Sequence, residues 1–348
     1  MRDVERILII QTAFLGDVVL TLPLVQVVKD FFASSKIDLL VIPRSAEIVR
    51  THPAVENVIV FDKYGMDKGI GGFVRIVSRI RKQRYSLAIV PHRSLRSALI
   101  VFLAGIPLRI GFDTSAGRIF YNKTVRYQKD IHESERNLSL LQALGIHHSA
   151  RQLPKLYPSQ EDSKQVDELL RALGIADTKR LIAISPGTIW NTKRWLKERF
   201  ASLAKLLTDE QFDIVLIGGK EDEALCSEIQ SLSSSNKVYN TAGKLSTLQS
   251  AELIRRCKLL VSNDSAPMHF AVAVGTPVVS IFGATVPEFG FAPLGRHDVV
   301  VETRGLQCRP CSIHGGDECP IKTFECMKNI TEERVFRKVT EVLERSSV

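Results

Sequence analysis

The 348-residue sequence lacks any long hydrophobic run, and this absence argues against a membrane-spanning helix. No segment reaches the roughly 18 uninterrupted apolar residues that such a helix needs. The pattern of a secretory signal is also missing, because charged residues precede the short apolar run from Ile7 to Ile10 and Asp17 interrupts the next apolar stretch. We therefore expect a cytoplasmic protein.

Two ligand-binding motifs are absent as well. The first predicted strand is not followed by G-x-G-x-x-G, so a nicotinamide-binding function loses its main support. There is no Asp-x-Asp, although a divalent ion that bridges a nucleotide diphosphate usually needs carboxylate ligands. We expect neither a cofactor nor a catalytic metal. Fixed cations and helix N-termini would have to neutralise a leaving diphosphate instead.

The charge is positive but spread along the chain. The net charge is +9, and the densest basic run extends from Arg75 to Arg84. This run is either the solvated face of a helix or a field that attracts an anionic partner, such as a phosphorylated lipid or a membrane surface. No zinc finger, RNP-type strand or basic-region helix accompanies it, so we expect no nucleic-acid partner.

Short apolar runs alternate with amphipathic stretches through both halves of the chain. The predicted strands are Arg6–Ile10, Ile37–Ile42, Asn57–Phe61, Ser86–Val90, Leu181–Ser185, Asp213–Ile217, Leu259–Ser262 and Val278–Phe282. Helical periodicity lies between them, for example at Phe200, Leu203, Ala204 and Leu207. This alternation predicts an α/β protein whose parallel sheets are covered on both faces.

The alternation pauses between about residues 145 and 180, where Pro154 and Pro158 suggest a linker. We predict a first Rossmann-like domain at 1–155, a second at 156–330 and a closing helix at 331–348. The length suits two domains. Sheets of this kind bind ligands at the carboxyl ends of their strands, so two of them would face a central cleft.

The segment 11–17, QTAFLGD, comes after the first strand and opens a helix. Gly16 would allow a tight backbone turn, and Asp17 stands near the helix start. Asp17 is either an N-terminal cap, which contributes about 1 kcal/mol, or a catalytic carboxylate.

His92, Arg93 and Arg96 come after another strand of the first half, at the end that should carry the ligand. Arg side chains hold phosphates and carboxylates through paired hydrogen bonds, so Arg93 and Arg96 are candidates for binding an anionic acceptor. Alternatively, Arg96 lies on the outer face of its helix.

The second half carries a candidate phosphate site after its first strand. Thr188 would donate a hydrogen bond and Lys193 would supply a positive charge, unless Lys193 faces water. Glu221 comes after the next strand, where a carboxylate can bind ribose hydroxyls or merely suit the start of a helix.

The strongest local signal is the segment 261–269, VSNDSAPMH. A helix begins near Ser265, and Pro267 suits its first turn. The free N–H groups near Asp264, Ser265 and Ala266 would form an anion site for a diphosphate. His269 either faces the ligand or packs one turn further on.

Six cysteines are present, and four of them cluster near the C-terminus. Cys308, Cys311, Cys319 and Cys326 resemble a structural zinc site in residue type but not in the usual spacing. The alternative is a reduced or redox-labile loop.

Together these segments resemble the lipopolysaccharide heptosyltransferases, glycosyltransferases of the GT-B fold, and most closely their heptosyltransferase II branch. The matching segments cover nearly the whole chain: FLGD at 14–17, RSA at 96–98, LAGIP at 103–107, PGT at 186–188, KRW at 193–195, NDS at 263–265, MH at 268–269 and CRPC at 308–311. The sequence departs from the family pattern at Leu196, where Pro is common, and at 266–267, where Ala-Pro replaces Gly-Leu.

The resemblance implies inverting transfer of heptose from ADP-heptose to an inner-core heptose on lipid A-linked Kdo, by an enzyme that can be peripheral on the inner membrane. It implies that Asp17 is the general base, with Gly16 on the acceptor side. Thr188, Lys193 and residues 264–266 would hold the diphosphate, and Glu221 the ribose. Heptosyltransferase I, another transferase of this fold, or a non-catalytic nucleotide-sugar-binding protein are the alternatives.

Overall fold

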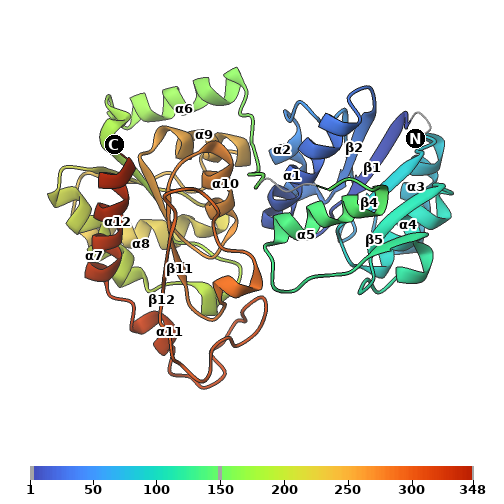
Figure 1. Ribbon diagram of the computed structural model, residues 1–348. Coiled ribbons are helices and arrows are strands. Elements are labelled where there is room, and N and C mark those ends of the chain that lie inside the picture. Colours follow the sequence, from blue (N-terminus) through green and yellow to red (C-terminus); the bar gives the residue numbers. More distant parts are fainter. Residues whose placement is uncertain (1–3, 148–150, 347–348) are drawn as a thin grey trace. The chain divides into compact units, whose positions relative to one another are not determined.

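The chain folds as two units, each built on one parallel sheet (Figure 1). The computed structural model describes residues 4–147 and 151–346. Unit 1 is Met1–Tyr157 and unit 2 is Pro158–Val348. The division therefore lies two residues after the linker boundary predicted at 155.

Unit 1 contains a six-stranded sheet in the order β3-β2-β1-β4-β5-β6. Its strands are β1 (Arg6–Ile10), β2 (Lys36–Val41), β3 (Asn57–Val60), β4 (Leu87–Val90), β5 (Leu108–Phe112) and β6 (Lys123–Val125). Its helices are α1 (Leu15–Phe31), α2 (Pro43–Val49), α3 (Gly69–Lys82), α4 (Leu95–Leu103) and α5 (Glu133–Ser139), with short 3₁₀ turns at Arg118–Phe120 and Leu140–Leu144. Helices α1, α2 and α5 cover one face of the sheet, and α3 and α4 cover the other (Figure 1).

Unit 2 repeats the plan with the strand order β12-β11-β10-β7-β8-β9. Its strands are β7 (Leu181–Ser185), β8 (Asp213–Leu216), β9 (Val238–Asn240), β10 (Leu259–Asn263), β11 (Val278–Phe282) and β12 (Val299–Glu302). Its helices are α6 (Gln160–Ala172), α7 (Lys197–Asp209), α8 (Glu223–Ser233), α9 (Thr247–Arg256), α10 (Ala266–Val274), α11 (Glu325–Lys328) and α12 (Glu332–Ser346). The 3₁₀ turns are Thr178–Arg180, Asn191–Lys193, Lys220–Asp222 and Pro287–Phe289.

Counted from the first strand of each unit, both sheets have the order 3-2-1-4-5-6 with all neighbours parallel. This is the strand order of Rossmann folds, so the predicted α/β class with two Rossmann-like domains is confirmed. The order reverses between β1 and β4 in unit 1 and between β7 and β10 in unit 2. Ligands of such sheets bind beyond the carboxyl ends of these two strands.

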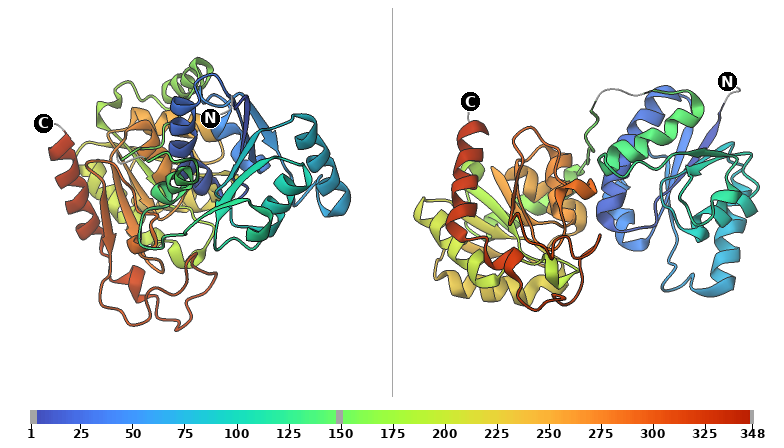
Figure 2. Two further views of the ribbon diagram at one scale, coloured as in Figure 1. Left: turned by 45° about the vertical axis from the view of Figure 1, so that its right-hand side comes forward. Right: turned by 60° about the horizontal axis from the view of Figure 1, so that its bottom comes forward.

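The central strands are fully buried, as their unbroken apolar sequence predicts. Residues Ile7–Ile10 and Leu181–Ile184 have no exposed surface. The closing helix α12 packs into unit 2 through Val335, Val339 and Val342 on one face (Figure 2, red). Within the described ranges, no helix is both long and apolar enough to cross a membrane.

Candidate active site

In unit 2, Asn263 joins the two strands at which the sheet order reverses. Asn263 is the last residue of β10. Its side chain accepts a hydrogen bond from Trp195 N (3.0 Å) and donates one to Pro186 O (2.9 Å). Both partners belong to the segment that comes after β7. A single buried amide therefore holds the β7 loop against the end of β10. The sequence predicted a site here but assigned no role to Asn263.

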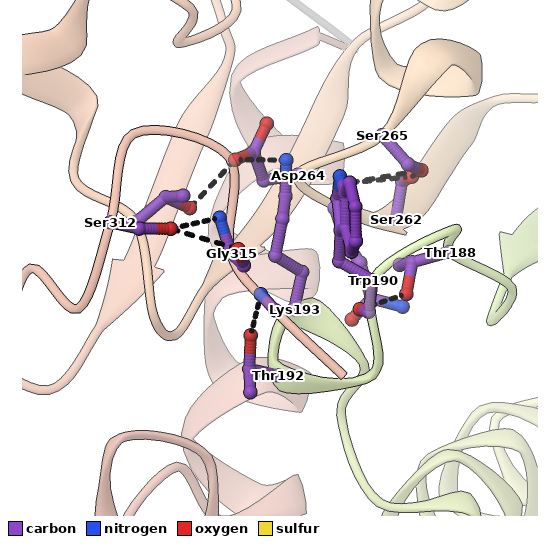
Figure 3. Close-up of polar contacts among 12 residues, drawn as sticks. Thr188, Trp190, Thr192, Lys193, Ser262, Asp264, Ser265, Ser312 and Gly315 are labelled. Atoms are coloured by element: carbon purple, nitrogen blue, oxygen red, sulfur yellow. Dashed lines mark hydrogen bonds and ion pairs between the residues drawn. The ribbon is translucent and has the colours of Figure 1, made fainter. Parts of the chain in front are cut away.

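Lys193 and Asp264 form the charged centre of this region (Figure 3). Lys193 Nζ lies 2.7 Å from Asp264 Oδ2, and the two side chains are only 16% and 8% exposed. Thr285 Oγ1 donates to the same carboxylate at 2.7 Å. Lys193 therefore does not merely face water. Because a carboxylate repels a diphosphate, the geometry favours Asp264 as the group that orients Lys193 over Asp264 as a direct ligand of phosphate.

Helix α10 begins directly after Asp264, with Ser265 as its N-cap residue in an extended conformation. The side chain of Ser265 forms no capping hydrogen bond to the first turn of α10. The N–H groups of Ser265 and Ala266 suit an anion, as predicted. The N–H of Asp264, which was predicted to share this role, donates instead to Ile281 O at 3.1 Å. His269 is only 5% exposed, which favours the structural alternative for this residue.

Thr188 and Glu221 lie beyond the ends of β7 and β8. The Thr188 hydroxyl donates to Trp190 O at 2.7 Å, so the hydrogen predicted to reach phosphate is used within the chain. Asp222, next to Glu221, caps the 3₁₀ turn Lys220–Asp222: its Oδ2 accepts a hydrogen bond from Gly219 N at 3.0 Å. A Cβ on Gly187 would lie 2.1 Å from Asp222, so this glycine is required for close packing. The Glu221 side chain is exposed.

The loop between β12 and α11 packs against the Lys193 segment. Thr192 N donates to Gly316 O (3.0 Å), and Gly316 N donates to Thr192 Oγ1 (2.8 Å). Arg309, which is buried, anchors the same loop by pairing with Glu302 (2.7 Å) and donating to Thr285 O (2.7 Å). The loop therefore supports Lys193 and Asp264 from one side. The cysteines of this loop were candidates from the sequence, but no role was predicted for Arg309.

The four clustered cysteines are free thiols. In the part of the chain that the structure describes, no group of three or more His, Cys, Asp or Glu side chains could hold a metal ion. Cys311 Sγ donates to Cys308 O, and Cys326 is buried in α11. Burial tends to raise the pKa of Cys319, but nearby backbone N–H groups outweigh it and lower this pKa. The predicted alternative of a metal site is therefore not supported.

In unit 1, His92 joins the reversing strands, as Asn263 does in unit 2. Its Nδ1 lies 2.9 Å from Thr12 Oγ1, after β1, and 3.0 Å from Ser97 Oγ, at the start of α4. Burial, with Lys63 and Arg93 nearby, lowers the pKa of His92 to about 4. His92 is therefore neutral at physiological pH and links the two loops, so it does not act as a cation there.

Asp17 is the third residue of α1, and its Oδ2 accepts a hydrogen bond from Phe14 N at 3.1 Å. The capping interpretation is thus correct for one carboxylate oxygen. A carboxylate offers about four acceptor positions, so capping does not prevent it from acting as a base. Gly16 lies inside α1, and helical backbone replaces the tight turn predicted for it.

Glu133 lies beside Asp17, although the two are more than a hundred residues apart. Helix α5 packs against α1, and Asn137 donates to Leu20 O (3.2 Å) between their second turns. Burial raises the pKa of Glu133 to about 7. The positive charges of Arg136 and Arg93 act against this rise, and the negative charge of Asp17 adds to it. Glu133 also pairs with Arg136 at 2.7 Å. No local sequence signal marks this cluster of four charges.

Arg93 and Arg96 both remain exposed near the carboxyl ends of the strands. The Arg93 guanidinium lies 4.1 Å from the centre of the Tyr127 ring, and that of Arg96 lies 6.0 Å from the centre of the Phe61 ring. Phe61 comes directly after β3, so Arg96 points toward the ligand-binding edge of the sheet. Aromatic stacking holds the charge of each arginine while leaving its N–H donors usable.

Comparisons with known proteins identify the family of this chain. The sequence profile described as glycosyltransferase family 9 (heptosyltransferase) matches residues 73–320. The chain is 30% identical to lipopolysaccharide heptosyltransferase 2 of Salmonella typhimurium over 82% of this chain and 84% of that protein. It is 28% identical to lipooligosaccharide heptosyltransferase 2 of Haemophilus ducreyi over 97% of this chain and 99% of that protein.

A solved structure has the same fold. The Escherichia coli ADP-heptose lipopolysaccharide heptosyltransferase II matches with a TM-score of 0.81 and 24% identity, over 99% of this chain and 100% of that one. The match spans both Rossmann-like units of this chain, each of which has charged side chains at its reversal point. Because the family profile covers well over half of the sequence, this chain belongs to glycosyltransferase family 9.

Proposed function

We propose that this chain is an inverting heptosyltransferase that moves heptose from ADP-heptose to an inner-core heptose of lipopolysaccharide, as heptosyltransferase II does. The observation that carries the proposal is the Lys193–Asp264 pair beside the first turn of α10, at the reversal point of the unit 2 sheet. A cation and helix amides converge there, as a leaving diphosphate requires. The relatives named heptosyltransferase 2 support the choice of donor and acceptor.

The donor would be held by unit 2. Lys193 and the N–H groups at Ser265 and Ala266 would take the diphosphate, and Glu221 the ribose hydroxyls. Negative charge accumulates on the diphosphate as the glycosidic bond breaks, so these groups stabilise the transition state more than the ground state. Protein cations and helix dipoles would therefore stabilise the leaving group, and no step would use a metal ion.

The acceptor would be held by unit 1. Asp17 removes the proton of the attacking hydroxyl, and the oxygen attacks the anomeric carbon from the face opposite ADP, so the configuration inverts. Arg93 and Arg96 would bind phosphates or carboxylates of the acceptor. Because a lipid A-linked acceptor is embedded in a bilayer, we place the enzyme in the cytoplasm, at the surface of the inner membrane.

The test is release of ADP from ADP-heptose with three acceptors: none, a deacylated Kdo₂ core without heptose, and the same core with one heptose. Release only with the heptose-bearing core, together with a product one heptose heavier by mass spectrometry, supports the proposal. Release with the heptose-free core instead would indicate a heptosyltransferase I activity. Binding of ADP-heptose without release would indicate a binding protein. Added chelator should leave the rate unchanged.

Asp17→Asn provides the residue-level arm of this test. Loss of a general base should lower turnover by about 10²-fold or more while ADP binding persists. Asp30→Asn is the matched control, because Asp30 is an exposed carboxylate at the other end of the same helix. Equal rates for the two variants would remove Asp17 from the role of base.

A further inference from the structure

Helix α3 and the loop before it carry a concentration of exposed apolar side chains that the proposed catalysis does not use. Tyr64, Met66, Ile70 and Val74 are 78%, 86%, 84% and 57% exposed. Single exposed apolar residues are common, but four within eleven residues form a patch. Ile70 and Val74 are one turn apart, so they lie on the same face of α3.

Specific contacts hold the loop before α3 against the helix, so the patch is part of the folded structure. Gly72 allows the contact, because a Cβ there would lie 2.3 Å from the backbone of Asp67. Arg75 donates to Met66 O (2.6 Å) and pairs with Asp67 (3.1 Å). Asp62 accepts from the backbone N–H groups of Gly65 and Met66, both at 2.9 Å. The two carboxylates of the loop are thus engaged by the chain itself.

Cations surround this patch. Residues 62–84 contain seven lysines and arginines against two aspartates. Arg75, Arg79, Arg81 and Lys82 are all exposed on α3, while Ile76 and Ile80 on its other face are buried. An amphipathic helix with apolar side chains beside a basic face is the pattern of segments that lie in a bilayer interface.

We infer that α3 and its preceding loop form a docking surface for an anionic phospholipid bilayer, with Tyr64, Met66, Ile70 and Val74 inserted among the lipids. We call residues 64–82 the α3 surface. Charge complementarity identifies the partner: anionic headgroups match the cations, and acyl chains match the aliphatic side chains. Single-stranded nucleic acid fits less well, because three of the four apolar side chains are aliphatic and cannot stack on bases.

This inference rests on the proposed function for its purpose, since docking would bring the enzyme to a lipid-anchored acceptor. The first experiment measures sedimentation with vesicles of phosphatidylcholine alone or with one third phosphatidylglycerol. The chain should bind the anionic vesicles more tightly, and binding should weaken with salt because surface charges are screened within about 10 Å at 0.1 M. Failure to bind the anionic vesicles would overturn the inference.

Two sets of variants test the two halves of the α3 surface. Arg75→Glu, Arg79→Glu and Lys82→Glu together should weaken vesicle binding at least 100-fold, since each cation lost accounts for roughly fivefold. Met66→Asp with Ile70→Asp should weaken it at least tenfold, because the inserted apolar area is lost. Leu232→Asp, an exposed leucine on α8, is the matched control and should have no effect.

The same variants are then assayed for ADP release with a lipid-anchored acceptor in vesicles and with its deacylated, water-soluble form. We expect loss only with the anchored acceptor. Unchanged vesicle binding in both sets would overturn the inference, as would tighter binding of single-stranded RNA than of vesicles at this surface. Vesicle binding without transfer to either acceptor would support docking and reject the proposed function, so the two failures are distinguishable.

Discussion

Lys193→Met tests whether the cation of the unit 2 site serves the ligand or only the fold. The Lys193–Asp264 pair is 2.7 Å long and largely buried. Breaking a buried pair by removing one partner typically costs about 3–5 kcal/mol, because it leaves an uncompensated charge. Since Lys193 keeps some exposure, we expect about 3 kcal/mol. In a unit of this size, that corresponds to a fall of roughly 6–12 °C in the melting temperature.

The expected loss of ligand affinity is separate from this loss of stability. A hydrogen bond to a charged group contributes about 1.5–3 kcal/mol, which corresponds to a 10- to 150-fold change in the Kd for ADP. The double variant Lys193→Met with Asp264→Asn removes the orphaned charge and keeps an oxygen that can accept from Thr285. It should recover most of the lost stability while ADP binding stays weak.

Calorimetric titration with ADP and thermal unfolding of the same samples check both expectations. Lys197→Met is the matched control, because Lys197 lies four residues later in an exposed pair with Glu228. That variant should change neither quantity appreciably. Recovery of ADP affinity together with stability in the double variant would refute the reasoning, since Lys193 would then act only by neutralising Asp264.

Three further predictions concern unit 1. Arg93→Ala and Arg96→Ala should each raise the KM for the acceptor and leave ADP affinity unchanged. Arg118→Ala, on an exposed turn, is the control. Equal weakening of donor and acceptor binding would indicate general damage to the unit. Glu133 has a folded-state pKa of about 7 against an ordinary value of 4.5, so the contribution of Glu133 to stability should fall as pH rises through this interval. Glu133→Gln should then gain about 3 kcal/mol relative to wild type between pH 4.5 and 8 in urea unfolding, whereas a pH-independent difference would contradict it. Burial lowers the pKa of His52 from 6.5 to about 4, so the contribution of His52 to stability should fall by about 2 kcal/mol as pH drops from above 6.5 to 5. His52→Phe should remove this part of the acid loss and leave the equal part expected from His92; an acid slope identical to that of wild type would exclude His52 as a source.

Eight of the strands were predictable because at least three residues of each are apolar, as is typical of strands buried in a parallel sheet. The strands β5, β6, β9 and β12 were not predicted. β6 and β9 have only three residues each and lie at sheet edges. In β5, Arg109 and Gly111 interrupt the apolar pattern. Edge strands bury less surface, so their sequences carry a weaker signal.

The location of the candidate site was predictable for a different reason. In parallel sheets, ligand-binding loops begin at the carboxyl ends of strands, and polar residues after an apolar run mark those ends. The pairing of side chains was not predictable. Lys193 and Asp264 meet because β7 and β10 are neighbours, and Glu133 reaches Asp17 because α5 packs against α1. Both contacts depend on strand order and helix packing, which local patterns do not contain.

For the basic run at 75–84, a tertiary contact favours one of the two interpretations of the pattern. A solvated helix face and a partner-binding field have the same cations, so counting charges cannot separate them. The difference comes from Met66, whose carbonyl is held by Arg75, and from Gly72, which lets the loop backbone approach α3. These contacts fix exposed apolar side chains beside the cations. A solvated face gains nothing from such side chains, whereas a bilayer interface uses both kinds at once. The apolar residues of the loop therefore favour the bilayer interpretation of the basic run. Substituting them is the most direct test of the docking inference.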